Sequence, residues 1–195
     1  GLTIVPPYDD DRIIAGQGTI GLELVEDLPD LATVLVPIGG GGLASGVATA
    51  IKTIRPDVRV LGVEPELAAD AHASLARGEI VRWSAADVAR TIADGTRTQA
   101  LGKRTFVHLR AFLDGVVLVS EAEIAGAVRL AAEEGEVPAG GLVRGKHARG
   151  QRQLRAHVAD GGALGQGQRG RAGAAVLEDL PAATAHRVAA QQLEN

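Results

Sequence analysis

Residues 32–43 of the 195-residue chain, ATVLVPIGGGGL, decide its fold. The run that opens this stretch, ATVLVPI, is continuously apolar, which is typical of a parallel strand buried on both faces of a sheet. Four glycines follow, and the small residues over 43–54 predict a helix. After a Pro-Asp turn, residues 58–63, VRVLGV, predict a second strand. The stretch therefore predicts a β-α-β unit with a glycine-rich first turn.

The same alternation of strands and helices extends over residues 1–141 and predicts the α/β class. We expect an open, mostly parallel sheet flanked by helices. Candidate N-caps Asp9, Asp10 and Asp11 precede the first helix, and the SEAE sequence at 120–123 matches a capping box. The further elements expected are helices over 12–27, 66–77, 85–92, 105–113 and 121–134, and a strand over 116–119.

Residues 142–195 differ in composition from the rest of the chain. They hold six of the eight glutamines and three of the five histidines, but no isoleucine and no aromatic residue. Arg, Gln, Gly and Ala dominate, and no run predicts a strand. One interpretation is a disordered tail, because so few large apolar groups cannot offset the entropy of ordering. The other interpretation is a frame-shifted reading of GC-rich DNA.

Composition excludes several classes of protein. Without cysteine the chain has no disulfide framework and no thiolate chemistry, and a formal net charge of -4 argues against nucleic acid as the main partner. No run approaches the roughly 18 apolar residues of a membrane helix. Residues 1–7 lack the basic and apolar segments of a secretory signal. We therefore expect a cytoplasmic globular protein without a membrane partner.

The start of the chain resembles the interior of a longer sequence. The chain begins at Gly1 and contains no methionine. Its first residues, GLTIVPP, are typical of the end of a buried strand. We therefore expect this sequence to be a fragment.

The glycines between the first strand and the following helix are suited to an anion. Glycine allows positive φ and lets the backbone approach a ligand closely, and free N–H groups at a helix N-terminus favour a phosphate. Their position beyond the carboxyl end of a strand favours a ligand over the alternative, a glycine turn that binds nothing. The stretch matches neither G-x-G-x-x-G with its acidic partner nor G-K-[ST], so nucleotide binding is disfavoured.

Three stretches in order resemble one family of enzymes. IAGQGTIGLE at 14–23, VLVPIGGGGL at 34–43 and GVEP at 62–65 are similar to the threonine/serine dehydratase (threonine ammonia-lyase) and serine racemase family, and ADG at 93–95 agrees. The resemblance covers residues 1–140 and marks the chain as the C-terminal part of a fold-type II pyridoxal-phosphate enzyme. It implies an incomplete copy of the large α/β domain, which has a tryptophan synthase β-like fold.

The resemblance also implies a binding site and a reaction. In the family, the tetraglycine loop binds the phosphate of pyridoxal 5'-phosphate through backbone N–H groups. This role falls here on Gly39, Gly40, Gly41, Gly42 and Leu43. The implied reaction converts threonine or serine to a 2-oxo acid and ammonia.

The residue that would carry this reaction is missing from the sequence. The cofactor requires a lysine that forms a Schiff base, which the family places in a Ser-x-Lys-x-Arg-Gly-like motif. Lys52, Lys103 and Lys146 all lack that context, and the family's Ser-Gly-Gly-Asn-like segment is absent. We therefore assign no catalytic residue and expect this chain alone to be inactive.

Two carboxylates after the second strand suggest a metal site. Glu64, Ala68 and Asp70 offer two carboxylates and a backbone carbonyl, a hard oxygen set that suits Mg²⁺ or Ca²⁺. The resemblance implies the same arrangement, Glu-x-x-x-Ala-x-Asp, for a divalent cation. The alternative is that both acids are solvated charges flanking a helix.

Several alternatives stay open at this point. A non-catalytic remnant, or a module that binds a phosphorylated metabolite, is one alternative, and a serine racemase-type or diaminopropionate-type enzyme is another. Glu136 lies in a segment similar to the family's Glu-Pro-x-Gly, although Val137 interrupts the match. For the intact parent, the resemblance implies an amino acid substrate and a homo-oligomer.

Overall fold

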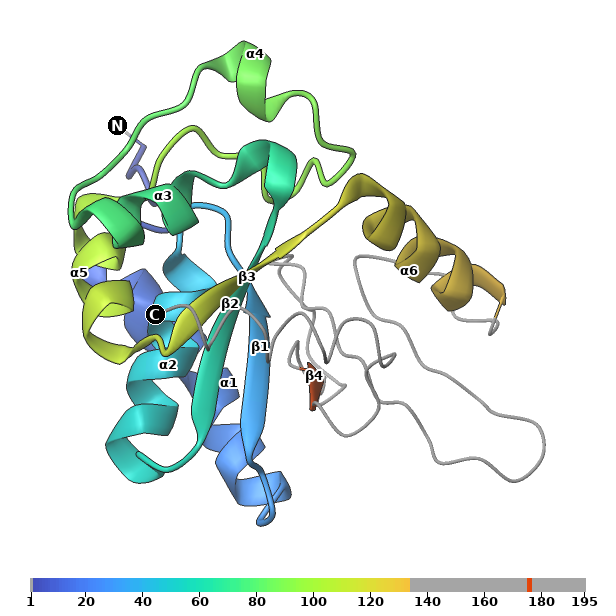
Figure 1. The fold of residues 1–195 in the computed structure, drawn as a ribbon. Coiled ribbons are helices and arrows are strands. Elements are labelled where there is room, and N and C mark those ends of the chain that lie inside the picture. The colour runs from blue at the N-terminus through green and yellow to red at the C-terminus, as the bar shows by residue number, and fades with distance from the viewer. Residues whose placement is uncertain (1, 134–174, 177–195) are drawn as a thin grey trace.

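The computed structural model describes residues 2–133 and 175–176. Helices and strands alternate along the chain, as the apolar pattern predicts (Figure 1). The elements are α1 (Asp11–Asp27), β1 (Thr33–Pro37), α2 (Gly42–Ile54), β2 (Arg59–Pro65), the 3₁₀ helix η1 (Glu66–Ala68), α3 (Asp70–Arg77), α4 (Ala85–Val88), α5 (Lys103–Phe112), β3 (Gly115–Val119), α6 (Glu121–Glu133) and β4 (Ala175–Val176).

The sheet has the order β3-β2-β1-β4, with β1, β2 and β3 parallel. In its register Leu35 pairs with Leu61, and Leu61 pairs in turn with Gly115. The short strand β4 pairs antiparallel with β1. The α/β prediction is therefore confirmed, and β4 lies in the part of the chain after residue 142 where no run predicts a strand. Two residues of β-structure carry too little pattern to be found in a sequence.

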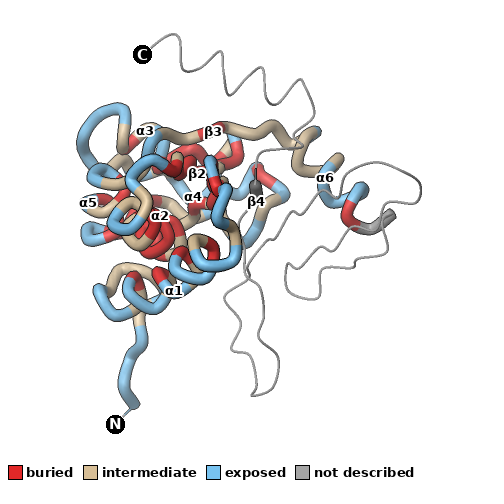
Figure 2. The backbone as a smooth tube through the Cα atoms, turned by 90° about the horizontal axis from the view of Figure 1, so that it is seen from below, coloured by how far each residue is buried: buried red, intermediate tan, exposed pale blue. Residues whose placement is uncertain are grey.

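The helices α1, α2 and α5 form a layer on one face of the sheet (Figure 1). The core lies between this layer and the strands, and α2 is its most buried helix (Figure 2). Val34, Val36 and Ile38 point into this core and are fully buried. On the other face of the sheet, Leu35, Leu61 and Val117 form a second, smaller cluster.

The motif IAGQGTIGLE forms most of α1, and two of its glycines let α1 and α2 pack closely. Gly18 and Gly21 both face the backbone of α2, and Gly46 faces α1. Gly16, which the same motif contains, has open space where a Cβ would lie. Gly18 therefore lets the two helices approach each other, whereas Gly16 has no such role among the described residues.

Two expected helices differ from those in the structure because side-chain oxygens accept hydrogen bonds from their backbone N–H groups. The helix expected over 66–77 is split into η1 and α3, since the carboxylate of Glu64 accepts from the amides that begin α3. The helix expected over 85–92 ends at Val88. Beyond it, Glu121 accepts from the Ile92 amide at 2.7 Å and Thr91 accepts from the Ala93 amide.

The capping box before α6 is confirmed. The Ser120 N–H and hydroxyl donate to Glu123 Oε2 at 2.8 and 2.6 Å, and the Glu123 N–H donates back to the Ser120 hydroxyl.

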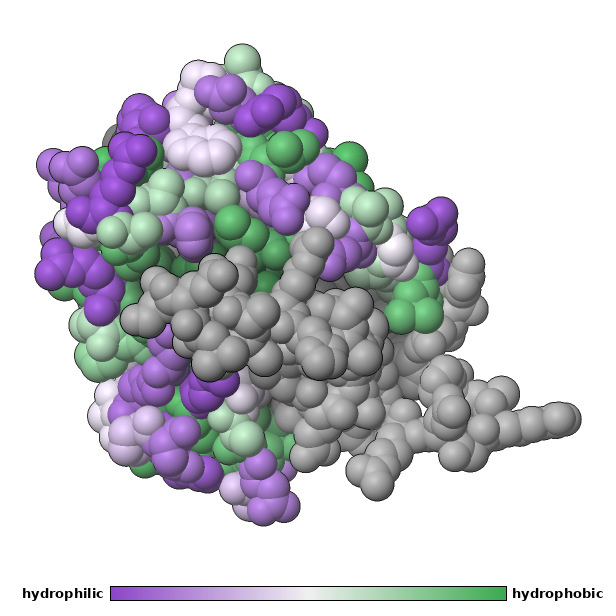
Figure 3. Space-filling view, in the orientation of Figure 1, coloured by the Kyte–Doolittle hydropathy of each residue, from purple (hydrophilic) through white to green (hydrophobic). Residues whose placement is uncertain are grey.

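Polar side chains cover much of the surface near α3 and α4 (Figure 3). None of the helices in the described part is long and apolar enough to cross a membrane. The interpretations of residues 142–174 and 177–195, and the candidate Glu136, lie outside the described residues.

Candidate functional site

The site lies at the edge of the sheet where β1, β2 and β3 end. The strands are parallel, so the segments that follow them share this edge. The tetraglycine loop follows β1, Glu64 lies near the end of β2, and Ser120 follows β3. Ligands of open α/β sheets bind beyond this edge.

The tetraglycine loop turns directly into α2. Its third glycine, Gly41, is the N-cap and has φ 93° and ψ 0°, a left-handed conformation that disfavours any side chain. In the first backbone hydrogen bond of α2, the Ser45 N–H donates to the Gly41 carbonyl at 2.9 Å. The N–H groups from Gly41 to Ala44 are therefore those that a helix leaves without an intrahelical acceptor.

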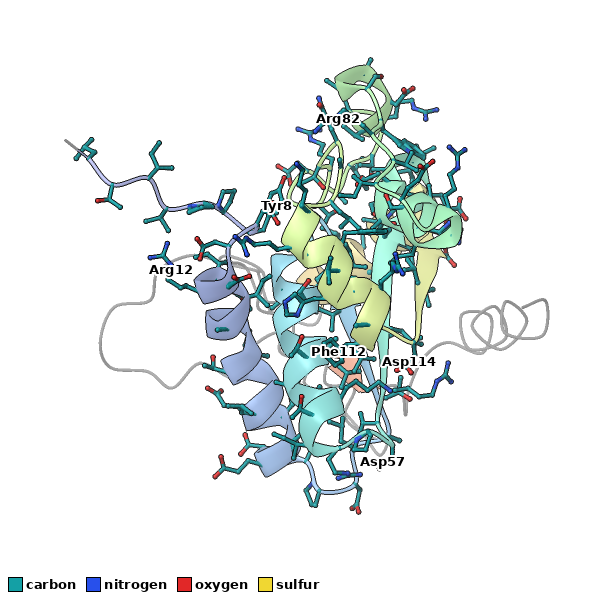
Figure 4. All side chains as sticks on the ribbon, turned by 90° about the vertical axis from the view of Figure 1, so that its left-hand side faces the viewer. Tyr8, Arg12, Asp57, Arg82, Phe112 and Asp114 are labelled. Atoms are coloured by element: carbon teal, nitrogen blue, oxygen red, sulfur yellow. The ribbon has the colours of Figure 1, made fainter. Side chains whose placement is uncertain are left out.

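Side chains pack around the loop so tightly that glycine is required. A Cβ on Gly40 would overlap the ring of Tyr8, and one on Gly42 would lie 2.9 Å from Tyr8 Cβ. A Cβ on Gly41 would lie 2.9 Å from Thr105 Cβ. Figure 4 shows Tyr8 at the amino end of α5, where the chain turns into α1.

The turn that contains the Ala-Asp-Gly motif lies beside the loop. The Thr96 N–H donates to the Ala93 carbonyl at 3.1 Å, which closes a turn around the motif. A Cβ on Gly39 would lie 3.3 Å from Thr96 Cα. The motif and the tetraglycine loop, separate in the sequence, therefore border the same site.

These features fit a phosphate group. The loop places backbone N–H donors at the N-terminus of α2, where the helix dipole adds partial positive charge. Without Cβ atoms, the backbone itself can approach the ligand oxygens. A phosphate is the chemical group that this donor set suits.

Glu64 and Asp70 are both buried, with exposed fractions of 1%. Glu64 accepts from the Ala71 N–H at 3.0 Å and from the His72 N–H at 2.8 Å. Burial raises the pKa of Glu64 to about 8, although these two amides act in the opposite direction. Burial likewise raises the pKa of Asp70 to about 7, and the positive charge of Arg82 lowers it in part.

The two acids fit a hard cation because the Asp70 carboxylate is buried and its charge is only partly compensated by Arg82. Neither carboxylate oxygen of Asp70 has a hydrogen-bond partner among the described residues. Such a group is costly to bury as an anion. Glu64 keeps free lone pairs on both oxygens, and the carbonyl of Ala68 lies on the same short segment, in η1. The described residues contain no group of three or more His, Cys, Asp or Glu side chains that could hold a metal ion, so any site here must include a backbone oxygen or water.

Neither of the described lysines has the setting expected of a catalytic amine. Lys52 lies in the last turn of α2, and its Nζ is 2.7 Å from Asp114 Oδ2. Asp114 lies at the carboxyl end of α5 in Figure 4, away from Tyr8. Lys103 begins α5 and is exposed, and Lys146 lies outside the described residues.

The sequence did not reveal three residues that hold the site together. Tyr8 and Thr105 contact the loop, and Asp9 binds the first turn of α5 through the Lys103 and Arg104 amides at 3.1 and 2.7 Å. The run of aspartates at 9–11 predicts a cap for α1, where Asp10 does act. No local pattern indicates that Asp9 caps a different helix, or that Tyr8 and Thr105 lie beside glycines.

Similar sequences agree with this geometry. The chain is 51% identical over 128 residues to L-threonine ammonia-lyase of Geobacter sulfurreducens, a match that covers 66% of this chain and 31% of that protein. It is 49% identical over 124 residues to the catabolic L-threonine dehydratase of Escherichia coli. That match covers 64% of this chain and 37% of the dehydratase. The chain thus spans about a third of the length of the curated relatives it matches.

Solved structures show the same fold. The processed threonine deaminase isoform 2 of Solanum lycopersicum superposes with a TM-score of 0.66 at 42% identity, over 70% of this chain and 39% of that one. The serine racemase of Dictyostelium discoideum superposes with a TM-score of 0.61 at 41% identity. The match covers 66% of this chain and 40% of that one. The family model described as "Pyridoxal-phosphate dependent enzyme" matches residues 1–153. The chain therefore belongs to the family of pyridoxal-phosphate dependent enzymes, with threonine ammonia-lyases and serine racemases among its relatives.

Proposed function

We propose that this chain is the phosphate-binding part of a pyridoxal-phosphate dependent ammonia-lyase that converts threonine or serine to a 2-oxo acid and ammonia. The single observation that carries this proposal is the tetraglycine loop, held with Gly41 at positive φ in front of the α2 N-terminus. The names of the relatives supply the reaction and the substrate class.

In this proposal, Gly39, Gly40, Gly41, Gly42 and Leu43 bind the cofactor's phosphate through backbone N–H groups. When bound, the cofactor supplies an electron sink for bond breaking at the substrate α-carbon. The contribution of this chain is to bind and orient: the α2 N-terminus would hold the phosphate, and the packing of Tyr8 against Gly40 would support the loop.

We further propose that Glu64, Asp70 and the Ala68 carbonyl bind Mg²⁺ or Ca²⁺. The unpartnered oxygens of Asp70 support this assignment, because a divalent cation would compensate their charge. The cation would hold η1 and the start of α3 against the end of β2.

These 195 residues by themselves are proposed to bind the cofactor without catalysing the reaction. Lys52 is engaged with Asp114, and neither Lys103 nor Lys146 lies in a Ser-x-Lys-x-Arg-Gly-like context. Borohydride treatment of the chain with pyridoxal phosphate is therefore expected to leave no covalently attached cofactor. A stoichiometric attachment to one lysine would contradict the proposal.

A binding experiment tests the phosphate site. The chain is titrated with pyridoxal phosphate and with pyridoxal, which lacks the phosphate, and inorganic phosphate is used as a competitor. We expect tighter binding of pyridoxal phosphate, and loss of that preference in Gly41→Asp, where a side chain and a like charge enter the loop. The matched control is Gly78→Asp, since Gly78 also has positive φ (73°) but open space around it. Equal affinity for the two ligands in the wild type would overturn the phosphate assignment.

The similarity to a serine racemase favours a second candidate activity for the whole enzyme. The two activities share the cofactor and serine as a substrate but differ in product. Assays of the complete enzyme with L-serine, for pyruvate and for D-serine, separate them.

A further inference from the structure

Thr105 reaches from α5 to the tetraglycine loop. Its hydroxyl oxygen lies 2.7 Å from the carbonyl oxygen of Gly40, across a separation of 65 residues. The side chain is fully buried. A longer contact of 3.1 Å joins the same hydroxyl to the Gly102 carbonyl. The hydroxyl has one proton, so the shorter contact marks the Gly40 carbonyl as its acceptor.

The Gly40 carbonyl accepts a second hydrogen bond from the same element. The Gly102 N–H, just before α5, lies 3.3 Å from it. Both donors lie on the α5 side of the loop, so the carbonyl points toward α5. In a planar trans peptide the C=O and the following N–H point in opposite directions. The Gly41 N–H therefore points away from α5.

The first turn of α5 is itself held in place. The Ser45 hydroxyl of α2 donates to the Thr105 carbonyl at 3.2 Å, so α5 is bonded to α2 as well as to the tetraglycine loop. Asp9 accepts from the Lys103 and Arg104 amides. Thr105 is therefore a fixed anchor for the loop.

An anchor is needed because the peptide between Gly40 and Gly41 has glycine on both sides. Glycine residues rotate about φ and ψ with little steric resistance. If this peptide turned over, the loop would present a carbonyl oxygen to the phosphate in place of an N–H, and the two would repel.

We propose that Thr105 is a positioning residue for the cofactor's phosphate: its hydroxyl holds the Gly40–Gly41 peptide so that the Gly41 N–H faces the ligand. This inference rests on the proposed phosphate-binding function of the loop. Thr105 acts through the peptide and not by touching the ligand.

The test compares variants that differ only in the hydroxyl. Thr105→Val removes it at nearly constant shape, Thr105→Ser retains it, and Thr105→Ala serves if the valine variant does not fold. Thr33→Val is the matched control, because Thr33 is also buried but lies at the opposite end of β1. The measured quantity is the ratio of the dissociation constant of pyridoxal to that of pyridoxal phosphate.

We expect Thr105→Val to reduce this ratio about tenfold, the effect of one hydrogen bond to a charged group. Thr105→Ser and Thr33→Val should stay within about twofold of the wild type, a margin well below that loss. In ligand-free protein, the Gly41 amide resonance should shift in Thr105→Val, whereas that of Gly78 should not.

A wild-type ratio in Thr105→Val or Thr105→Ala, with an unmoved Gly41 resonance, would overturn the role of Thr105 and leave the phosphate site intact. A ratio of one in the wild type would instead overturn the phosphate site, and the role of Thr105 with it.

Discussion

The backbones of α1 and α2 meet at Gly18 and Gly46. A Cβ placed on Gly46 would lie 2.6 Å from the Gly18 nitrogen, closer than real Cβ contacts come. The atoms in the way belong to the backbone, which cannot rotate aside as a side chain can. This contact sets the distance between the two helices and, through α2, the place of the tetraglycine loop.

Gly46→Ala should therefore destabilise the fold, by about 1–3 kcal/mol or more, as overpacking does in well-packed cores. Gly16→Ala in α1 is the matched control, because a Cβ there meets open space. The free energy of unfolding of the control should rise by about 0.5–1 kcal/mol, because alanine has a better helix propensity than glycine. Urea denaturation of both variants measures the difference, and equal effects would contradict this account of the helix contact.

Asp9 should contribute more to stability than Asp11, although the two aspartates are neighbours. Asp9→Ala removes the acceptor of two α5 amides and should cost about 0.5–2 kcal/mol, the range for helix caps. Asp11→Ala removes only an exposed ion pair with Arg104 and should cost about 0–1 kcal/mol. Thermal unfolding of the two variants in the same buffer decides the order. A larger loss for Asp11→Ala would contradict it.

Mg²⁺ should raise the melting temperature of the wild-type chain if Glu64, Ala68 and Asp70 bind it. At a concentration of about 100 times the dissociation constant, the gain in unfolding free energy would be about 2.7 kcal/mol. Asp70→Ala should abolish this gain, whereas Asp57→Ala, an exposed aspartate paired with Arg55, should keep it. A wild-type melting temperature that does not respond to Mg²⁺ or Ca²⁺ would overturn the metal site.

Without divalent cations, stability should fall as pH rises from about 4 to about 8. The folded-state pKa of Glu64 is raised from 4.5 to about 8 and that of Asp70 from 3.8 to about 7. Between the unfolded and folded values the folded chain binds more protons, so the free energy of unfolding decreases with pH. Asp70→Asn should make this decrease smaller. Denaturant midpoints at pH 5 and pH 8 measure it, and an unchanged slope in the variant would contradict the assignment to Asp70.

The sequence by itself determined the alternation of elements and the glycine loop. These are local features: the run ATVLVPI, the four glycines and the helix after them. Strand burial, positive φ and helix periodicity can be predicted from residues that are neighbours in the sequence. The capping box at Ser120 and Glu123 belongs to the same class and is confirmed. The motifs shared with the dehydratases also located the family.

Only the tertiary structure decided which residues surround the loop and why the helices are interrupted. Thr105 and Gly40 are joined by a hydrogen bond across 65 residues, and Asp9 caps a helix that begins far along the chain. Glu64 splits one predicted helix in two by accepting from the amides of α3. These partners are fixed by chain packing: a hydroxyl or carboxylate has many possible acceptors or donors in a sequence, and burial selects one.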